Sequence, residues 1–228
     1  MKRSEINSIM KDALEFLEEF SWSLPEWASW SLEQWQEHYR VCEQIFKCNL
    51  GWDITDFGSN DFKRKGLFLF TLRNGIYGKS AKTYAEKIMI VRENQETPLH
   101  FHWNKMEDII NRGGGKLQFQ LYKASENEEL SDESFDVYLD DRKYHISAGE
   151  TISLNPGQSL CLEPFVYHRF YGAPGEGDVL VGEVSQVNDD SRDNRFYDNV
   201  GRFPLVEEDE KPLHYLVSDY EAFKKEFL

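Results

Sequence analysis

The segment TPLHFHWNKMEDIINRGGGK, residues 97–116, decides the fold that we expect for this chain. Residues i and i+2 of an extended strand project from the same face, so His100 and His102 are predicted to point one way. Glu107 follows five residues after His102 and returns a carboxylate to the same place once the chain bends. The glycine run 113–115 then predicts a turn, and the alternating LQFQLY of residues 117–122 predicts the next strand.

This arrangement of side chains is typical of a metal site. Two imidazole nitrogens and one carboxylate on one face suit a divalent transition metal with open coordination positions. His168, within EPFVYHRF, is a fourth candidate ligand. The alternative is a pair of surface histidines on an edge strand, but the carboxylate, the glycine turn and the second strand favour a metal. His145 lacks this framing, so we leave it out of the site.

Composition limits the class of protein. The chain has 228 residues, 40% hydrophobic and 14% aromatic, which is enough to bury one good-sized core. Its formal charge of −15 repels phosphate backbones and anionic lipids, so we expect neither nucleic acid nor a membrane as a partner. The longest apolar run, residues 66–72, has the length of a strand rather than of a membrane span.

The cysteines and the N-terminal sequence favour a cytoplasmic location. The three cysteines form no CxxC pair and their number is odd, as expected for a reducing compartment. The opening sequence, MKRSEINSIMKDALEFLEEF, is charged throughout and lacks the apolar segment of a signal peptide.

Hydrophobic spacing predicts helices before the β-rich part of the chain. Apolar residues recur three and four apart over residues 4–20, with acidic residues on the other face. Ser31 and Gln34 resemble a capping box, which opens a second helix reaching about Lys47.

Short strands dominate the middle of the chain. We expect them at residues 66–72, 85–91, 117–123, 135–139, 143–147, 150–154, 159–164, 168–172 and 178–185. A hairpin turn is expected at Asp140, Asp141 and Arg142. Many short strands at this spacing predict a mainly β sandwich or barrel.

Two further segments follow the last strand. Residues 187–204, VNDDSRDNRFYDNVGRFP, are polar and long enough to form a functional flap. Ser218 and Glu221 form a capping-box pair for a C-terminal helix over residues 216–228. We expect one domain over residues 1–228. Within it, a helical extension (1–50) packs on a barrel core (66–200).

The first segment resembles the first motif of the cupin superfamily, which is an HxH pair, a spacer, a glutamate and then a glycine. His100, His102, Glu107 and Gly113 match that motif. The second cupin motif has a proline–glycine turn before the third histidine, whereas here a proline precedes His168 with no glycine between them. The resemblance implies a cupin-type β-barrel, or jelly roll, in which His168 completes the ligand set.

Two longer stretches resemble the bacterial D-lyxose ketol-isomerases: HFHWNKMEDIINRGGG, residues 100–115, and EVSQVNDDSRDNRF, residues 183–196. The similarity extends over almost the whole chain. It implies a Mn²⁺-dependent aldose–ketose isomerase of free sugars, converting D-lyxose to D-xylulose and D-mannose to D-fructose. We expect Mn²⁺, with Co²⁺, Fe²⁺ and Zn²⁺ as alternative ions, and a homodimer.

This chemistry assigns roles to particular residues. Moving a proton between C2 and C1 through an enediol needs a base at carbon, a Lewis acid and a group that handles the hydroxyl proton. An acid in an apolar strand is costly unless it faces a functional cavity, so Glu183 is assigned as the base. Lys105, between His102 and Glu107, is assigned to stabilise the enediolate oxygen or relay its proton. The alternatives are an outward-facing strand acid and a solvated turn lysine.

Four more residues are candidates for sugar contacts. Asp190 and Arg195 lie in the polar loop after Glu183 and are candidates for hydrogen bonds to hydroxyl groups. Trp103 and Phe119 are candidates for walls of the sugar site. The alternative is a solvated loop for the first two residues and core packing for the aromatic pair.

Two other functions fit part of the pattern. A cupin dioxygenase binds Fe(II) with the same ligand types, and oxygen uptake would separate it from an isomerase. A non-catalytic sugar-binding or sensor module needs no buried base, so a solvent-facing Glu183 would favour it.

Overall fold

Two antiparallel β-sheets form the body of the protein in the computed structural model, which describes residues 1–227 and the side chains through residue 225. The larger sheet has the strand order β1 (Gly51–Thr55), β2 (Leu67–Arg73), β3 (Tyr84–Val91), β12 (Val179–Gln186), β5 (Glu107–Gly114), β10 (Ser159–Leu162), β7 (Phe135–Leu139) and β8 (Arg142–Ile146). The smaller sheet has the order β13 (Arg195–Phe196), β4 (His100–Phe101), β11 (Val166–Gly172), β6 (Leu117–Lys123) and β9 (Thr151–Leu154).

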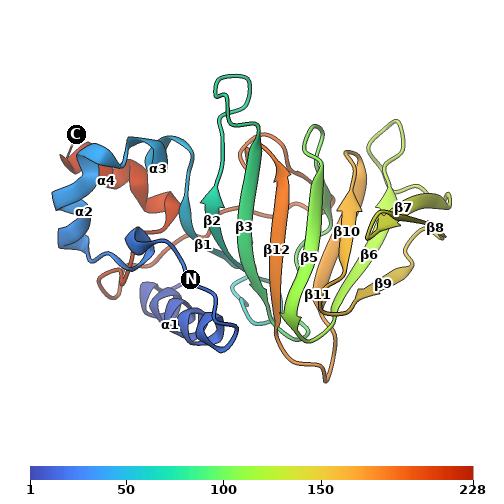
Figure 1. The fold of residues 1–228 in the computed structure, drawn as a ribbon, viewed down its shortest axis with the longest axis horizontal. Coiled ribbons are helices and arrows are strands. Elements are labelled where there is room, and N and C mark those ends of the chain that lie inside the picture. The colour runs from blue at the N-terminus through green and yellow to red at the C-terminus, as the bar shows by residue number, and fades with distance from the viewer. Residues whose placement is uncertain (228) are drawn as a thin grey trace.

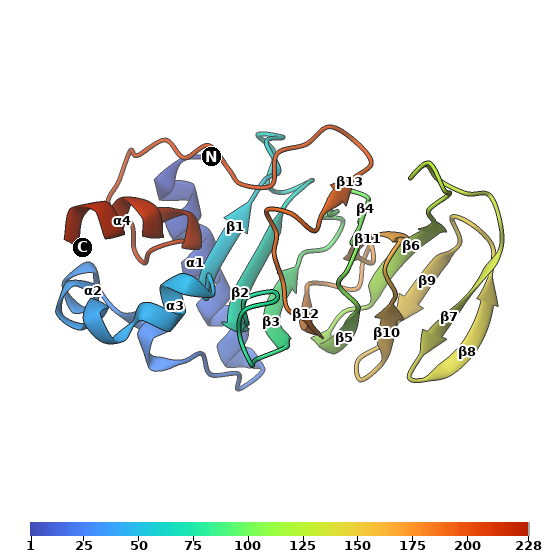
Figure 2. The ribbon, with the colours of Figure 1, turned by 90° about the horizontal axis from the view of Figure 1, so that it is seen from above.

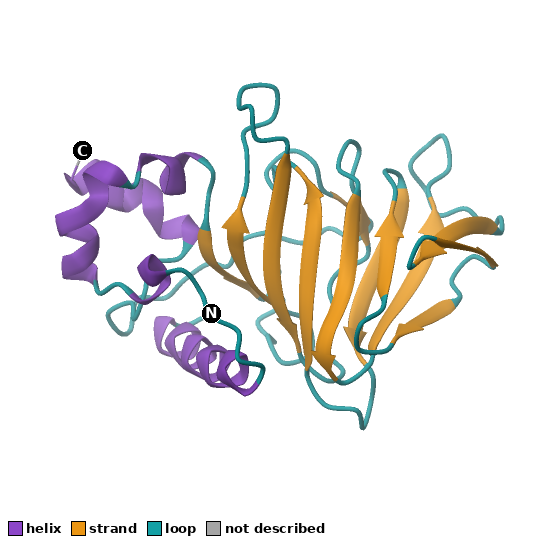
Figure 3. Cartoon of the chain, in the orientation of Figure 1, coloured by secondary structure: helices purple, strands orange, loops and turns teal. Residues whose placement is uncertain are grey.

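Helices gather at one end of these sheets (Figures 1 and 3). They are α1 (Arg3–Glu19), the 3₁₀ turn η1 (Glu26–Ser29), α2 (Leu32–His38), the 3₁₀ turn η2 (Tyr39–Val41), α3 (Glu43–Lys47), the 3₁₀ turn η3 (Val217–Asp219) and α4 (Tyr220–Phe227). The prediction of a mainly β, cupin-type fold with flanking helices is therefore confirmed.

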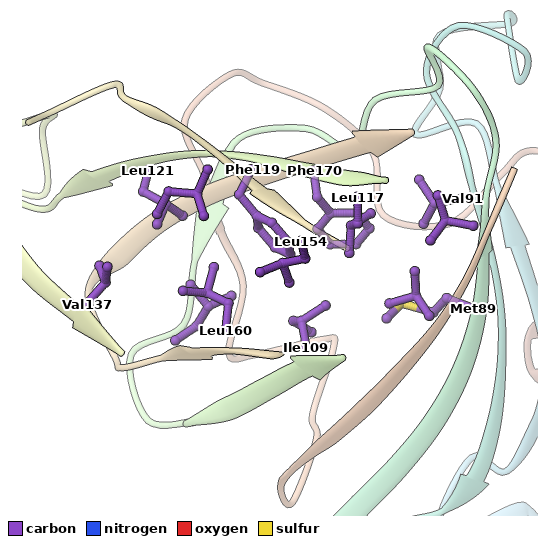
Figure 4. Packing of buried hydrophobic residues seen from close by; sticks show 14 of the residues in the cluster. Met89, Val91, Ile109, Leu117, Phe119, Leu121, Val137, Leu154, Leu160 and Phe170 are labelled. Atoms are coloured by element: carbon purple, nitrogen blue, oxygen red, sulfur yellow. The ribbon is translucent and has the colours of Figure 1, made fainter. Parts of the chain in front are cut away.

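The main core lies between the facing sides of the two sheets. In β6, Leu117, Phe119 and Leu121 are buried while the residues between them are partly exposed, as a period of two requires. They pack toward Ile109 of β5 and Leu160 of β10, which belong to the other sheet (Figure 4). Each large apolar side chain buried in this way contributes about 1.5–3 kcal/mol to folding.

Two strand registers position the functional residues. β12 lies between β3 and β5, so Glu183 is opposite Lys87 on one side and Ile109 on the other. In the smaller sheet, β4 pairs with β11 and sets His100 directly opposite His168. Figure 2 shows β4, β11 and β13 together on the side away from β12 and β5. The two sheets thus bring residues from distant parts of the sequence to one place.

Helix α1 covers part of the outer face of the larger sheet. Its buried stripe includes Ile6, Met10 and Leu17, which belong to one cluster with Phe68 of β2 and Leu180 of β12. The spacing of four and seven residues between the helix positions is that of one helical face. The prediction of an amphipathic helix over residues 4–20 is confirmed.

The second predicted helix is interrupted. Ser31 and Gln34 do form a capping box, but the helix ends at His38 and resumes as α3 after the turn η2. A continuous helix would separate Trp35 from Phe46 by roughly 16 Å along its axis. The break lets the two rings approach to 5.7 Å between centroids, so the prediction of one helix to Lys47 is wrong because aromatic packing prevails.

The C-terminal helix begins differently from the prediction for residues 216–228. Ser218 lies inside the turn η3, so Ser218 and Glu221 do not cap the helix. The Asp219 carboxylate accepts a hydrogen bond from the Leu216 N–H instead, at 2.8 Å. The last residue of the predicted helix lies outside the described residues.

The predicted strands are confirmed, with shifts of one or two residues at their ends. The Asp140–Asp141 hairpin is confirmed too, since both residues have positive φ, 48° and 59°, as a tight two-residue hairpin turn requires. Three further strands, β1, β5 and β13, were not predicted. β13 contains only two residues, too few for a pattern of alternation to appear.

The glycine run after β5 allows a close approach of the chain. Gly114 has φ of 86°, and a Cβ atom there would lie 2.2 Å from the carbonyl oxygen of Asp178. A side chain at Gly115 would meet the carbonyl oxygen of Glu176 at 2.5 Å. The glycines therefore serve backbone packing between the β5–β6 connection and the start of β12.

In residues 1–227 the structure has no helix that is both long enough and apolar enough to cross a membrane.

We predict that the docking of α1 stabilises the whole fold. Leu17→Ala should lower the free energy of unfolding by about 2–5 kcal/mol, because Leu17 is 1% exposed and its removal leaves a cavity. Leu205→Ala is the matched control, since Leu205 is 91% exposed and should change stability by less than about 0.5 kcal/mol. Denaturant unfolding of both variants checks this, and equal effects would contradict it.

Candidate active site

Three histidines meet at the inner face of the smaller sheet. One potential ligand atom from each of His100, His102 and His168 lies within 4.8 Å of the others. The ring centroids of His100 and His168 are 4.2 Å apart, as their opposite positions on β4 and β11 require. The structure therefore brings His168 to the HxH pair, although no glycine precedes it.

A turn at Phe165 takes the place of the expected glycine. Phe165 has φ of 63°, a left-handed conformation that favours glycine, and its N–H donates to the carbonyl oxygen of His102 at 3.0 Å. Its ring lies 5.3 Å from that of Phe101. This turn connects the backbone of the first histidine pair to the strand that carries His168.

Glu107 places a carboxylate oxygen between two of the histidines. Oε1 is 3.3 Å from Nε2 of His102 and 3.2 Å from Nε2 of His168. Oε2 is 2.6 Å from Nζ of Lys105. Glu107 is the first residue of β5 and is buried, so the bend after His102 returns the carboxylate as the sequence predicts.

Hydrogen bonds fix the tautomer of each imidazole. In each histidine, Nδ1 lies at hydrogen-bond distance from a backbone carbonyl oxygen. The partner of His100 is Pro98, at 2.9 Å. The partner of His102 is Asp193, at 2.7 Å, and that of His168 is Val166, at 3.0 Å. A carbonyl oxygen can only accept, so Nδ1 must carry the proton. The Nε2 atoms are therefore the nitrogens left to bind a ligand.

The ionisation of these groups suits a metal. Burial, together with the charges of neighbouring groups, lowers the pKa of His100 well below its ordinary value and also lowers the pKa of His102. Burial opposes ionisation of Glu107, but the Lys105 ammonium and the contacts of His102 hold the pKa of Glu107 well below its usual range. Neutral imidazoles and an ionised carboxylate are the ligand forms of these side chains.

Such an arrangement fits a divalent cation. Lone pairs of uncharged imidazole nitrogens and of a carboxylate oxygen, about 3.2–3.3 Å apart, repel one another unless a cation lies between them. Three nitrogens and one oxygen are a common donor set for Mn, Fe, Co or Zn. The residues present therefore fit the metal that the sequence predicts, and their role as ligands stays a prediction.

Glu183 lies beside this cluster, at the inner face of β12. It is 4% exposed and accepts hydrogen bonds from Nζ of Lys105 at 3.1 Å and from Oγ of Ser185 at 2.9 Å. Nζ of Lys87 lies 3.2 Å from its carboxylate. The structure thus excludes a solvent-facing Glu183, although its role as a base stays a prediction.

Lys105 is held as a cation. Burial would lower its pKa, but the negative charges of Glu107 and Glu183 outweigh this and raise the pKa well above its ordinary value. A lysine in this state can donate protons and stabilise negative charge, but it cannot accept a proton. Its location between the two carboxylates agrees with the role assigned to it at the substrate oxygens.

Lys87 is a residue of the site that sequence reasoning missed. It is 3% exposed, lies opposite Glu183 in the sheet, and donates to Oδ1 of Asn188 at 2.9 Å. The sequence does contain an indication of it, because a lysine within the apolar segment AEKIMIV, residues 85–91, is as unusual as the acid at position 183.

A second ionic group closes the cavity from the polar loop. Arg202 binds Asp53 of β1 at 2.6 Å and Asp190 of the loop at 2.9 Å. Burial opposes ionisation of Asp190, but Arg202 and the two lysines hold the pKa of Asp190 well below its usual range. Asp190 therefore lines the cavity as an ionised acceptor, as a sugar contact requires. Asp53 and Arg202 were not predicted.

Residues of two kinds line the cavity. The polar group is His100, His102, His168, Lys87, Lys105, Glu107, Glu183, Asp190, Arg202, Thr97 and Asn194. The apolar group is Phe57, Leu67, Leu69, Met89, Ile109, Phe170 and Phe196. Apolar walls around convergent polar groups are typical of a small-molecule site.

Three predicted sugar contacts lie elsewhere. Phe119 is fully buried in the core next to Phe170. Trp103 donates its indole N–H to Glu128 at 2.8 Å, and Arg195 lies 3.3 Å from the same carboxylate. Trp103 directly follows His102, so alternation turns its side chain to the other side of the chain. The cavity thus gives no support to sugar contacts by these three residues.

Comparisons with known proteins give similarity over almost the whole chain. A family model described as D-lyxose isomerase matches residues 1–220. A D-lyxose/D-mannose isomerase of Serratia proteamaculans is 49% identical over 226 residues, which cover 98% of this chain and 99% of that protein. Another from Escherichia coli O157:H7 is 47% identical over 227 residues, covering 98% of this chain and 100% of that protein.

A solved structure shares the fold at low sequence identity. The L-ribose isomerase of Acinetobacter sp. DL28, in complex with L-ribose, superposes with a TM-score of 0.61 at 14% identity. The match covers 91% of this chain and 98% of that chain. The likeness extends beyond the sheets to most of the chain.

We predict that metal binding releases few protons. Three ordinary histidines would release about two protons on binding a metal at pH 6. Because the pKa values of His100 and His102 are lowered, these two histidines should contribute few of these protons, and fewer than two should be released at pH 6. Calorimetry of Mn²⁺ binding in two buffers of different ionisation enthalpy measures this number. Release of two protons at pH 6 would contradict the lowered pKa values.

Proposed function

The chain belongs to the D-lyxose isomerase family and is an aldose–ketose sugar isomerase, and we propose that it interconverts D-lyxose with D-xylulose and D-mannose with D-fructose. One observation of the structure supports the proposal above all. Glu183, a buried carboxylate that is not one of the proposed metal ligands, lines the same cavity as the three histidines and Glu107.

We assign the carbon-bound proton to Glu183. Its carboxylate accepts the proton from C2 of the aldose and returns it to C1, which passes the substrate through an enediol. Lys87 and Ser185 hold this carboxylate from the side of the sheet, which fixes its direction. Burial slows the access of bulk water to this carboxylate, so return of the abstracted proton to C1 competes with its exchange with solvent.

We assign the oxygen-bound proton and the developing negative charge to Lys105. Its ammonium lies within 3.1 Å of both Glu107 and Glu183, next to the place where the substrate oxygens must lie if Glu183 reaches C2. A fixed cation in a buried site stabilises an enediolate oxygen more than it would in water. Asp190, held by Arg202, is the proposed acceptor for a hydroxyl group farther along the sugar.

His100, His102, Glu107 and His168 are the proposed ligands of Mn²⁺. When bound, the ion would supply Lewis-acid stabilisation to the carbonyl and hydroxyl oxygens of the substrate. Co²⁺, Fe²⁺ and Zn²⁺ also bind to imidazole nitrogens and carboxylate oxygens, so ion identity is tested by restoring activity to chelated enzyme with each ion in turn.

Three further properties are proposed on the basis of the sequence. We propose that residues 1–228 act as one domain, that the protein works as a homodimer and that it resides in the cytoplasm. The odd cysteine number supports the last of these. Light scattering of the purified protein measures the oligomeric state.

The two other candidate functions receive less support. A dioxygenase would consume oxygen when substrate is added, whereas an isomerase consumes none. A sugar-binding module would not need a buried acid with three hydrogen-bonding partners, yet Glu183 has them. A panel of aldoses, read out as ketose formation with and without oxygen, tests all three functions at once.

We predict that Glu183→Gln abolishes proton transfer but leaves the metal site intact. The amide keeps the size of the side chain but cannot accept the proton, so kcat should fall about 10²–10⁴-fold. Exchange of the C2 proton of D-lyxose or D-mannose with D₂O should decline in parallel. Metal content should match that of the wild type, because Glu183 is not one of the proposed ligands.

The matched control is Glu176→Gln, an exposed acid before β12 that pairs with Lys116 at 2.6 Å. This variant should keep wild-type kcat. A Glu183→Gln enzyme with near wild-type turnover would move the base to Asp190, because Lys105 is held in its protonated form.

A further inference from the structure

We propose that the polar loop of residues 187–194 is part of the metal site, and that Asp193 is the positioning residue that joins it to His102. The inference rests on the proposed metal site and goes beyond it. It concerns a residue outside the catalytic cavity and predicts a linkage between metal binding and loop order.

The three histidines differ in what orients them. His100 and His168 each donate from Nδ1 to the carbonyl oxygen two residues earlier in their own segments. His102 donates instead to the carbonyl oxygen of Asp193, 91 residues later in the chain, at 2.7 Å. Two of the imidazoles are thus oriented by their own backbone, and the third by the polar loop.

The side chain of Asp193 holds the loop in place. It is 7% exposed, and its carboxylate accepts hydrogen bonds from the Asn104 N–H at 2.9 Å, the Asn104 side-chain amide at 3.0 Å and the Lys105 N–H at 2.9 Å. Hydrogen bonds to a charged group are stronger than those between neutral groups. One residue therefore holds the turn after His102 with its carboxylate and the His102 ring with its carbonyl oxygen.

The same loop carries other groups of the site. The side chain of Asn188 accepts hydrogen bonds from both lysines, Lys87 at 2.9 Å and Lys105 at 3.3 Å. Asp190 lines the cavity. If the loop detaches from the turn, His102 loses the partner that fixes its tautomer, and both lysines lose an acceptor.

Thermodynamic linkage gives this contact a consequence. Loss of a hydrogen-bond partner behind a metal-binding histidine typically lowers metal affinity by about 10–100-fold. Since coupling between two equilibria is reciprocal, a bound metal must in turn stabilise the attached loop. Asp193 is the residue through which both effects pass.

The first experiment compares two aspartates of the same loop. Asp193→Ala removes the carboxylate but keeps the backbone carbonyl. Asp189→Ala is the matched control, because among the described residues the Asp189 carboxylate binds within the loop, to the N–H and hydroxyl of Ser191 at 3.2 and 2.6 Å. Calorimetry on chelator-stripped protein should show Mn²⁺ binding to Asp193→Ala about 10–100-fold more weakly than to the wild type.

Wild-type affinity in the Asp189→Ala variant supports the proposal. Wild-type affinity in Asp193→Ala overturns it. Thermal unfolding of both metal-free variants shows whether the carboxylate also matters for folding, and a loss of affinity by both variants alike overturns the specific role of Asp193.

The second experiment needs no variant. Hydrogen exchange of the wild-type protein should slow on addition of Mn²⁺ in residues 187–194 and at the amides of Asn104 and Lys105. Residues 117–123, in β6, are the internal control and should not change. The slowing in the loop should be absent from Asp193→Ala even at saturating Mn²⁺.

The outcomes separate the proposed linkage between the loop and the metal from the proposed metal site itself. If the wild type binds Mn²⁺ but loop exchange does not respond, the linkage is wrong while the metal site stands. If the wild type binds no divalent ion, the proposed metal site fails and the role of Asp193 fails with it.

Discussion

The ammonium of Lys105, held between the carboxylates of Glu107 and Glu183, is the interaction on which the arrangement of the site depends. Buried charges are costly unless they are paired, and this lysine pairs with one proposed metal ligand and with the proposed base at the same time. It thereby connects β5 with β12 in the centre of the larger sheet. Removing it would leave the buried Glu107 carboxylate without its lysine partner and Glu183 with Lys87 as its remaining cation, so the positions of the proposed metal ligand and of the proposed base are coupled.

The charged side chains that line the cavity balance one another. Three are cationic, Lys87, Lys105 and Arg202, and three are anionic, Glu107, Glu183 and Asp190. When the C2 proton moves to Glu183, this carboxylate becomes neutral while negative charge forms on the enediolate oxygen. The total charge is unchanged, so the cavity has to stabilise a shift of negative charge from Glu183 toward Lys105 rather than a new charge.

Local sequence patterns predicted most of the strands and three of the four proposed metal ligands. Alternation placed His100 and His102 on one face, and the cost of burying an acid in an apolar strand singled out Glu183. The same reasoning applied to Lys87 would have found it. Asp53, Arg202 and Asp193 could not be found in this way, because each acquires its partner through tertiary contacts across 12 to 149 residues of sequence. Trp103 and Phe119 do not line the cavity, because a position near the metal motif in the sequence does not fix the face to which a side chain turns.

Phe165 shows how this chain can do without a glycine in its second motif. A left-handed conformation costs a residue with a side chain about 1–2 kcal/mol, whereas contact between aromatic rings contributes about 0.5–1.5 kcal/mol. The ring of Phe165, packed on Phe101, therefore offsets most of the strain in its own backbone. Glycine at this position would relieve the strain and lose the contact, with a net effect close to zero. A motif defined by glycine therefore overlooks this chain, in which contact between two aromatic rings takes the place of the glycine.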